Sequence, residues 1–315
     1  MIYKKRSKPL MLVGLESLII RLPNNHYYYP KVEEDLRKRR AGFAGELNFD
    51  KHINEFRPSY PIALLHDVCL LQNGVYFQMD SVMILPDRIL IFEVKNLAGT
   101  LRVKTNPTQF IQEHYEERKV INSPITELDR KKIFLELWLK ERGFNIPIKG
   151  IVALAFTNEL HNENQMDTIL AFTQEIPIIL YDMKVSDELI NRIEMKKLAV
   201  EMINAHQEYN PLPLCRTMNI PREEILSGVI CQNCSEGKMQ WQKKRWKCIV
   251  CQSVCANSHH QLLSDWFCLI DNKITNREFR SFSMIDDRSV AKRMLKKSGL
   301  LMTGKAKTAF YSKHR

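Results

Sequence analysis

The sequence lacks an apolar run long enough to span a lipid bilayer. The longest run near its beginning, Pro9 to Ile20, is interrupted by Glu16 and falls short of the roughly 20 residues that a transmembrane helix needs. No small-residue cleavage site follows it, because Arg21 comes directly next. The sequence therefore predicts neither a signal peptide nor an anchor. We expect a cytoplasmic protein whose cysteines are reduced thiols or metal ligands.

Internal repeats and low-complexity tracts are also missing. Charged residues make up only 26% of the chain and hydrophobic residues 44%, a composition that argues against extensive disorder and supports folded cores. A chain of 315 residues exceeds the usual size of one domain, so we expect two or three folded units.

The net charge of +11 is unevenly distributed. Residues 1–215 contain 28 Lys and Arg against 28 Asp and Glu, whereas residues 216–315 contain 19 basic and 8 acidic residues, so 19 − 8 gives the whole excess of +11. A neutral body with a basic last third predicts a polyanionic partner there, nucleic acid above all. A basic surface that serves only solubility is the alternative.

The hydrophobic pattern of the first 200 residues predicts an α/β unit. A helix over 35–56 precedes an antiparallel meander of strands at 60–71, 75–85 and 88–95, with turns at 73–74 and 86–87. A helix over 123–142, a buried strand at 149–157, a short strand at 177–181 and a helix over 186–206 follow.

The strand 88–95 carries two charged residues on one face. Alternate side chains of a strand share a face, so Glu93 and Lys95 are neighbours about 7 Å apart. If the preceding turn is centred between positions 86 and 87, cross-strand partners sum to 173 and Asp80 lies opposite Glu93. Two such carboxylates could share one Mg²⁺ or Mn²⁺ ion, with the ammonium beside them.

This arrangement suits phosphodiester hydrolysis, because a divalent metal polarises a phosphoryl oxygen and a lysine offsets developing negative charge. The alternative reading is a surface ion pair between Glu93 and Lys95. A longer loop would also shift the register by one residue and reverse the face.

Three ordered motifs carry a family resemblance: AGFAGE (Ala41–Glu46), FQMD (Phe77–Asp80) and FEVKNLAG (Phe92–Gly99). Together they resemble the nuclease-related domain, NERD, of the PD-(D/E)xK nuclease superfamily, over about residues 1–200. The resemblance implies a restriction-endonuclease-like core, in which a mixed sheet is flanked by helices.

The resemblance also implies roles for four residues. Glu46 would be the acidic residue borne by a helix, Asp80 and Glu93 the metal ligands, and Lys95 the catalytic lysine. One departure is that no glutamine stands in the helix after 122–124. Glu127 or Glu113 could replace it.

Four cysteines have the spacing of a metal site. Two C-x₂-C pairs are separated by thirteen residues, a pattern typical of a Cys₄ zinc ribbon that staples a segment too short to bury a core. The predicted ligands are Cys231, Cys234, Cys248 and Cys251, and four thiolates leave no open position, so the zinc would be structural. Cys255 could compete as a ligand, but we expect it to be spare.

Basic and aromatic residues alternate between the cysteine pairs, as in surfaces that grip phosphates and stack on unpaired bases. The candidates for nucleic-acid binding are Lys243, Lys244, Arg245 and Trp246. The alternative is that both ribbon tryptophans, Trp241 and Trp246, only pack the ribbon.

The last 40 residues predict a winged helix. A helix over 275–284, capped by Thr275 or Asn276, a helix over 289–297 closed by Gly299, and a hairpin around Gly304 give its outline. Basic residues would lie on the second helix and on the wing: Lys292, Arg293, Lys296, Lys297, Lys305 and Lys307. The alternative is a small helical cap.

The predicted organisation is a NERD domain at 1–209, a linker at 210–228, a Cys₄ zinc ribbon at 229–256 and a basic helical or winged-helix-like module at 257–315. The predicted function is a Mg²⁺- or Mn²⁺-dependent nuclease that acts on nucleic acid, with DNA favoured. The alternative is a nucleic-acid-binding protein that keeps the fold without the activity. A third possibility is an adaptor for an acidic protein partner.

Overall fold

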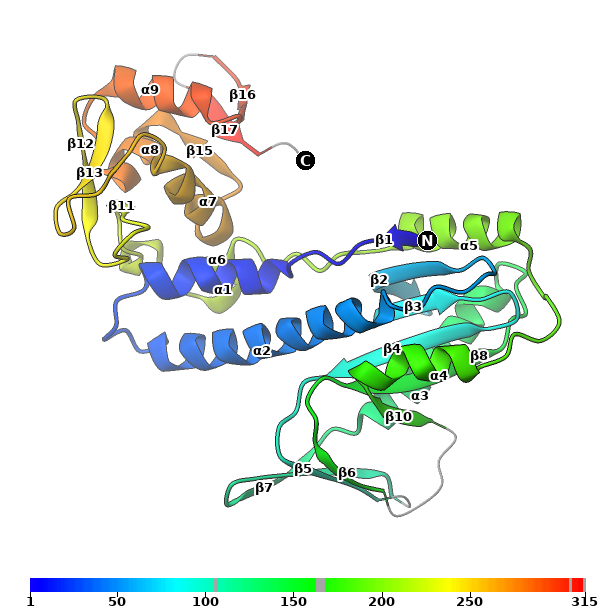
Figure 1. Cartoon of the computed structure of the whole chain (residues 1–315). Coiled ribbons are helices and arrows are strands. Elements are labelled where there is room, and N and C mark those ends of the chain that lie inside the picture. Colours follow the sequence, from blue (N-terminus) through cyan, green and yellow to red (C-terminus); the bar gives the residue numbers. More distant parts are fainter. Residues whose placement is uncertain (105–106, 163–167, 306–307, 314–315) are drawn as a thin grey trace. The chain divides into compact units, whose positions relative to one another are not determined.

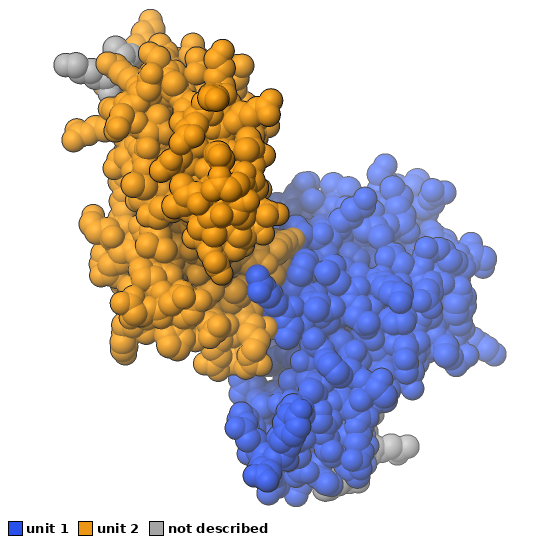
Figure 2. Space-filling model, turned by 60° about the vertical axis from the view of Figure 1, so that its left-hand side comes forward, with its two compact units in different colours: residues 1–7, 40–208 blue, residues 8–39, 209–315 orange. Residues whose placement is uncertain are grey.

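The computed structural model describes residues 1–104, 107–162, 168–305 and 308–313, which form two compact units (Figures 1 and 2). Unit 1 comprises residues 1–7 and 40–208, and unit 2 comprises residues 8–39 and 209–315. The boundary falls inside helix α2 (Tyr29–Ile53). This division differs from the predicted one, because residues 8–39 group with the C-terminal third.

Unit 1 is built on a six-stranded mixed sheet of order β1-β2-β3-β4-β8-β10. The neighbours β2, β3 and β4 are antiparallel, which confirms the predicted meander, and β1, β8 and β10 pair in parallel with their neighbours. The strands are β1 (Ile2–Lys4), β2 (Ala63–Gln72), β3 (Val75–Ile84), β4 (Ile89–Lys95), β8 (Ile148–Leu154) and β10 (Ile169–Phe172).

Short turns fix the register of the meander. Asn73 and Gly74 join β2 to β3 with φ angles of 51° and 77°, the left-handed pair that a tight hairpin turn requires. The connection from β3 to β4 is closed by the Leu85 N–H, which donates to the Arg88 carbonyl at 2.9 Å. Each turn lies where the sequence predicts it.

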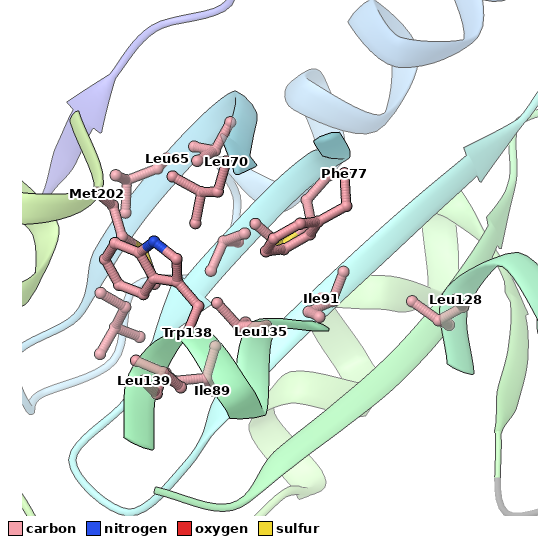
Figure 3. Close-up of a cluster of buried hydrophobic side chains, with 14 of the residues drawn as sticks. Leu65, Leu70, Phe77, Ile89, Ile91, Leu128, Leu135, Trp138, Leu139 and Met202 are labelled. Atoms are coloured by element: carbon pink, nitrogen blue, oxygen red, sulfur yellow. The ribbon is translucent and has the colours of Figure 1, made fainter. Parts of the chain in front are cut away.

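Helices cover both faces of this sheet, as the predicted fold class requires. On one face, α3 (Pro124–Lys140) packs on β4 and α5 (Arg192–Ala205) packs on β2, in one cluster that includes Ile89 and Ile91; Figure 3 shows Trp138 and Leu135 of α3 in this cluster. On the other face, the C-terminal part of α2 and α4 (Ile176–Asp182) pack on β4 residues 90, 92 and 94. Burial of each large side chain stabilises the fold by about 1.5–3 kcal/mol.

The strand predicted at 177–181 is wrong, because this segment is part of helix α4. Pro177 occupies the first turn of the helix, where proline is favourable. Ile176 and Leu180, four residues apart, are buried, whereas Ile178 is exposed, which is the period of a helix. The sheet takes its last strand from β10 instead, after which a 3₁₀ turn (Thr173–Glu175) leads into α4.

Capping sets the limits of the other two helices. Ser123 caps α3, where a helix start is predicted. The helix predicted from residue 186 begins later, because Asn191 and Glu194 form a capping box at the start of α5.

A second, four-stranded sheet, which is not predicted from the sequence, has the order β7-β6-β5-β9. Its strands are β5 (Thr100–Lys104), β6 (Gln109–His114), β7 (Glu117–Ile121) and β9 (Glu159–Asn162).

Unit 2 contains the cysteine-rich ribbon and a helical module. The ribbon is an antiparallel sheet of β11 (Val229–Ile230), β12 (Lys238–Gln242), β13 (Arg245–Cys248) and β14 (Val254–Cys255). The module runs in the order α7 (His259–Leu269), β15 (Lys273–Thr275), α8 (Asn276–Ser283), α9 (Arg288–Lys297), β16 (Leu301–Thr303) and β17 (Phe310–Ser312). Its sheet order is β15-β17-β16, which is the outline of a winged helix with α7 and β15 added to the predicted elements.

The apolar run at the start of the sequence forms α1 (Leu10–Arg21) within unit 2. No helix within the described ranges is both long and apolar enough to cross a bilayer.

The predicted linker at 210–228 contains α6 (Leu214–Met218) and a 3₁₀ turn (Arg222–Glu224). It also buries Leu214 and Ile225, so it is a packed segment of unit 2.

Arg21, at the end of α1, connects several elements of unit 2. Its side chain is only 1% exposed and pairs with Asp265 of α7 at 2.7 Å. It also donates to the carbonyls of Leu226 and Gly228 and lies over the Phe282 ring. Burial lowers the pKa of Arg21, and the Asp265 carboxylate opposes that shift.

We expect Arg21→Met to destabilise unit 2 by about 3–5 kcal/mol, because it leaves the Asp265 carboxylate buried without a cation. Calorimetric unfolding of the full chain would measure this. The double variant Arg21→Met/Asp265→Leu should regain part of the loss, and equal stability of the two variants would contradict the account.

Candidate functional site

The β3–β4 register brings the predicted carboxylates together. The paired residues run from Ile84↔Ile89 to Ser81↔Phe92, and every pair sums to 173. One step further along this register, Asp80 faces Glu93. The face predicted for Glu93 and Lys95 is also confirmed, because Ile89 and Ile91 belong to the cluster under α3 and α5.

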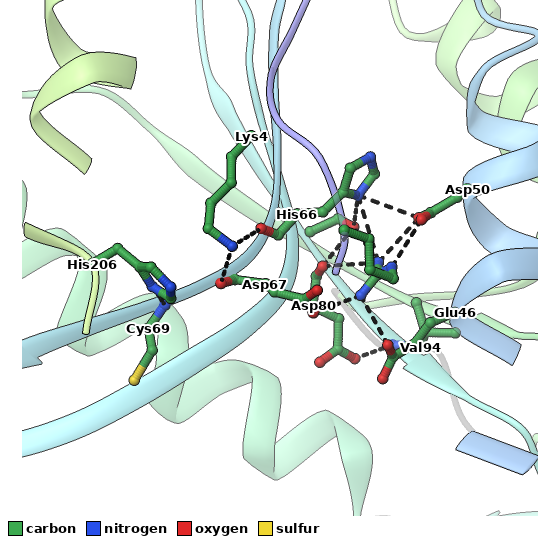
Figure 4. A network of polar contacts seen from close by, with 11 residues as sticks. Lys4, Glu46, Asp50, His66, Asp67, Cys69, Asp80, Val94 and His206 are labelled. Carbon is green, nitrogen blue, oxygen red and sulfur yellow. Dashed lines mark hydrogen bonds and ion pairs between the residues drawn. The ribbon is translucent and has the colours of Figure 1, made fainter. Parts of the chain in front are cut away.

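At the end of the β3–β4 hydrogen-bond ladder, the Asp80 side chain replaces a backbone carbonyl as the hydrogen-bond acceptor. Its Oδ2 accepts a hydrogen bond from the Val94 N–H at 2.8 Å (Figure 4). The half-buried carboxylate has no ion pair within the described part of the chain. Burial, and next the charge of Glu93, raise the pKa of Asp80 to about 6.

Glu93 is buried between two ammonium groups. Lys95 Nζ lies 2.8 Å from Glu93 Oε1, and Lys131 of α3 contacts Oε2. Burial alone would raise the pKa of Glu93, but Lys131 and Lys95 hold it below its usual value. Glu127 of α3 accepts from Lys95 Nζ at 2.7 Å. Although burial opposes it, the charges of Glu93 and Glu127 raise the pKa of Lys95.

Glu46 reaches the same region from α2. Burial and then the charge of Asp80 raise the pKa of Glu46 to about 7, while Arg6 opposes the shift. Arg6 Nη1 donates to Glu46 Oε2 at 3.0 Å. Each of the four predicted site residues therefore lies in one charged cluster, which we call the carboxylate cluster: Glu46, Asp80, Glu93 and Lys95.

Arg6 joins Glu46 of this cluster to two neighbouring carboxylates. Its side chain is only 2% exposed and donates to Asp50 Oδ2 at 2.8 Å and Asp67 Oδ1 at 2.7 Å. It also donates to the backbone carbonyl of Asp80 at 3.0 Å. Burial lowers the pKa of the neighbouring His66 to about 4, so a neutral imidazole faces the guanidinium.

Two charged residues of this site, Arg6 and Lys131, are not among those predicted from the sequence. Lys131 stands four residues after Glu127 on α3, so both share one helix face, and this spacing could have identified it. No local signal could have found Arg6. Of the two alternatives for an added site residue, Glu127 lies in the cluster, whereas Glu113 pairs with Arg102 and Arg118 on the second sheet.

The four predicted cysteine ligands converge in the ribbon. Their sulfur atoms all lie within 4.8 Å of one another, with Cys231 and Cys251 3.6 Å apart and Cys234 and Cys248 3.7 Å apart. Tetrahedral zinc with Zn–S bonds of about 2.3 Å requires sulfur atoms about 3.8 Å apart. The geometry is therefore compatible with a zinc ribbon. Cys255 is exposed and does not belong to this cluster.

The two ribbon tryptophans differ in exposure. Trp246, a predicted nucleic-acid contact, is 1% exposed, and its Nε1 lies 3.3 Å from His259 Nδ1. That prediction is wrong for the ring, because a buried indole cannot stack on a base. Trp241 packs edge-on against it and is partly exposed.

The predicted basic residues lie on three exposed features of unit 2: the β12–β13 turn, α9 and the wing. Lys243, Lys244 and Arg245 are exposed at the β12–β13 turn, where both lysines have positive φ angles of 47° and 64°. On α9, Ala291 and Leu295 face the core, and the predicted basic residues are exposed: Lys292, Arg293, Lys296 and Lys297. Lys305 is exposed on the wing, and Lys307 lies outside the described residues.

We expect Arg6→Ala to destabilise unit 1 by about 3 kcal/mol or more, because it removes the guanidinium that pairs with three partly buried carboxylates. Lys5→Ala, at the exposed neighbouring position, is the matched control and should change stability by less than about 0.5 kcal/mol. Thermal unfolding of both variants would measure the difference. A loss for Arg6→Ala no larger than that of the control would contradict the role of Arg6.

Comparison with known proteins bears on this region. Residues 41–155 match the family model described as the nuclease-related domain. No curated protein and no solved structure matches the chain. The matched segment runs from the second half of α2 to the end of β8 and includes the whole carboxylate cluster. This chain contains a nuclease-related domain, as the three motifs in its sequence suggest.

Proposed function

We propose that the protein is a Mg²⁺- or Mn²⁺-dependent nuclease that hydrolyses phosphodiester bonds of nucleic acid, with DNA as the favoured substrate. The observation that carries the proposal is the β3–β4 register, which sets Asp80 opposite Glu93 within a nuclease-related domain. Lys95, on the same strand face as Glu93, completes the set of groups that this chemistry needs.

Asp80 and Glu93 would hold the divalent ion, because carboxylate oxygens are its preferred ligands. Asp80 fits this role, since a half-buried carboxylate without a cationic partner among the described residues is unfavourable. At Glu93 the ion would replace Lys131, whose flexible side chain reaches in from α3. When bound, such an ion polarises a phosphoryl oxygen and stabilises the leaving oxygen.

Lys95 would act on the substrate side of the cluster. Glu127 and Glu93 hold its ammonium group in place and keep it protonated by raising its pKa. A protonated lysine can orient the attacking water and offset the negative charge that develops on the phosphoryl group. Glu46 would be the acidic residue that α2 contributes.

For the cysteine cluster we infer a structural Zn²⁺ ion. The ligands would be Cys231, Cys234, Cys248 and Cys251, and four thiolates leave no position for a substrate. The ion would fix the ribbon, whose strands β11 and β14 have only two residues each. The exposed cations of the ribbon turn and of α9 would then hold the nucleic acid by its phosphates.

A second candidate is a nucleic-acid-binding protein without nuclease activity. The observation that favours it is the engagement of both Glu93 oxygens by ammonium groups. If these pairs persist in solution, Glu93 is not available to a metal ion.

We expect purified protein with Mg²⁺ or Mn²⁺ to cleave labelled DNA, and we expect Lys95→Ala and Asp80→Asn each to slow cleavage on the order of 100-fold or more. Glu136→Gln, an exposed carboxylate on α3, is the matched control and should cleave like the wild type. Single- and double-stranded DNA and RNA would be compared on gels. A folded wild type that leaves every substrate intact in both metals would favour the second candidate.

Zinc content provides an independent check on unit 2. We expect one zinc ion per chain by mass spectrometry, because the cluster has a single set of four ligands. Cys251→Ser should lose the ion and lower the unfolding temperature of unit 2. Cys255→Ser should keep it, and retention of zinc by both variants would show that Cys251 is not a ligand.

A further inference from the structure

Two adjacent hollows on unit 2 lie between the ribbon and the α8–α9 connection. The larger, of about 540 Å³, is lined by β12 and by residues 284–287. The smaller, of about 430 Å³, is lined by α8 and by the same connection. Met284, Ile285 and Asp286 line both, so the two hollows adjoin, and together we call them the ribbon groove.

The larger hollow offers the surfaces that an unpaired base needs. The partly exposed Trp241 ring lies on one wall, and Met284, 65% exposed, lies on the other. Met284 takes the left-handed conformation (φ 59°) at the end of α8, a position that glycine usually occupies. An aromatic ring and a polarisable thioether are both suited to the flat face of a base.

The smaller hollow carries the charge that a phosphate needs. Arg277 is exposed there, and Arg280 lies three residues further along the same helix face. The Nε of Arg280 is buried without a hydrogen-bond partner among the described residues, whereas its Nη1 is fixed on the Asp286 carbonyl at 3.2 Å. Two arginines that line one hollow can both contact a phosphodiester, because guanidinium groups match the geometry of its oxygens.

The walls of the groove are held together by Gly228. Its N–H donates to the Phe282 carbonyl at 2.7 Å, which joins the start of the ribbon to the end of α8. A Cβ at this position would lie 3.2 Å from both Met284 Sδ and Lys238 Cδ, so a glycine allows the two walls to approach. The groove is therefore a built feature of unit 2.

We infer that the ribbon groove binds a single-stranded nucleic acid, with one unpaired base against Trp241 and Met284 and an adjoining phosphate on Arg277 and Arg280. Bases in a duplex are stacked on one another and cannot offer a face to Trp241, so a duplex does not fit. Exposed Lys243 and Lys244 at the β12–β13 turn extend the basic surface along the path of the strand. The inference rests on nucleic acid being the proposed ligand and specifies its form.

Asp286 favours one orientation of the bound nucleic-acid strand in the groove. It lines both hollows, and its negative charge disfavours a phosphate in the middle of the groove. A carboxylate can instead accept a hydrogen bond from an exocyclic amino group of a base. The phosphate is thereby directed to the arginine end.

The test measures binding of fluorescent single-stranded DNA, single-stranded RNA and duplex DNA by anisotropy. The full zinc-loaded chain carries Asp80→Asn and receives no Mg²⁺ or Mn²⁺, so cleavage does not interfere. We expect both single strands to bind more tightly than the duplex, and Trp241→Ala to weaken single-strand binding about tenfold. Trp241→Phe should retain most of the binding, because a second aromatic ring can stack.

Arg277→Ala tests the phosphate end. It should reduce the slope of log affinity against log salt concentration by about 0.7, the value for one phosphate contact on a single strand. Tyr27→Ala, an 87% exposed aromatic residue of unit 2 outside the groove, and Arg216→Ala, an exposed arginine, are the matched controls and should change neither quantity. Zinc content shows that each variant has a folded ribbon.

Three results would overturn the inference: no nucleic-acid binding, equal affinity for single strand and duplex, or single-strand binding that neither Trp241→Ala nor Arg277→Ala alters. If the wild type cleaves nucleic acid but either of the last two results is found, the proposed nuclease stands and the groove does not. If the groove variants behave as expected but no metal supports cleavage, the groove stands and the nuclease activity falls.

Discussion

The pairing of β3 with β4 is the constraint on which the candidate active site depends. A strand alternates its side chains between two faces, so a shift of one residue would move Glu93 and Lys95 from the face under α3 to the face under α4. The short connection through residues 85–88 excludes that shift by fixing the sum of paired positions at 173. Asp80 then stands at the end of the ladder, where its carboxylate accepts the Val94 N–H.

Concentrating carboxylates at this point is unfavourable unless cations accompany them. The protein supplies those cations from three segments: Arg6 from the segment that follows β1, Lys95 from β4 and Lys131 from α3. Asp80 alone lacks such a partner within the described part of the chain. Carboxylates therefore still outnumber cations in this region, and such an excess of negative charge would favour an added cation.

Much of the fold and of the candidate site could be predicted from the sequence, because these features depend on residues that are close together in the chain. Strand alternation and a short turn give the position of Asp80 against Glu93, and paired C-x₂-C spacing gives the cysteine cluster. Contacts between distant segments leave no such signal. Arg21 and Asp265, 244 residues apart, draw α1 into unit 2, and nothing in either neighbourhood indicates it. The strand prediction for the short apolar segment 177–181 is wrong because five residues do not distinguish a strand from a helix by pattern alone.

The most direct test of the central claim is the binding of Mn²⁺ to the full chain, followed by electron paramagnetic resonance. The account predicts at least one Mn²⁺ site in the wild type that is lost in both Asp80→Asn and Glu93→Gln, with zinc content unchanged. Loss in both variants would show that the two carboxylates share one ion. Mn²⁺ binding that is the same in the wild type and both variants would contradict the claim that the β3–β4 register builds a metal site.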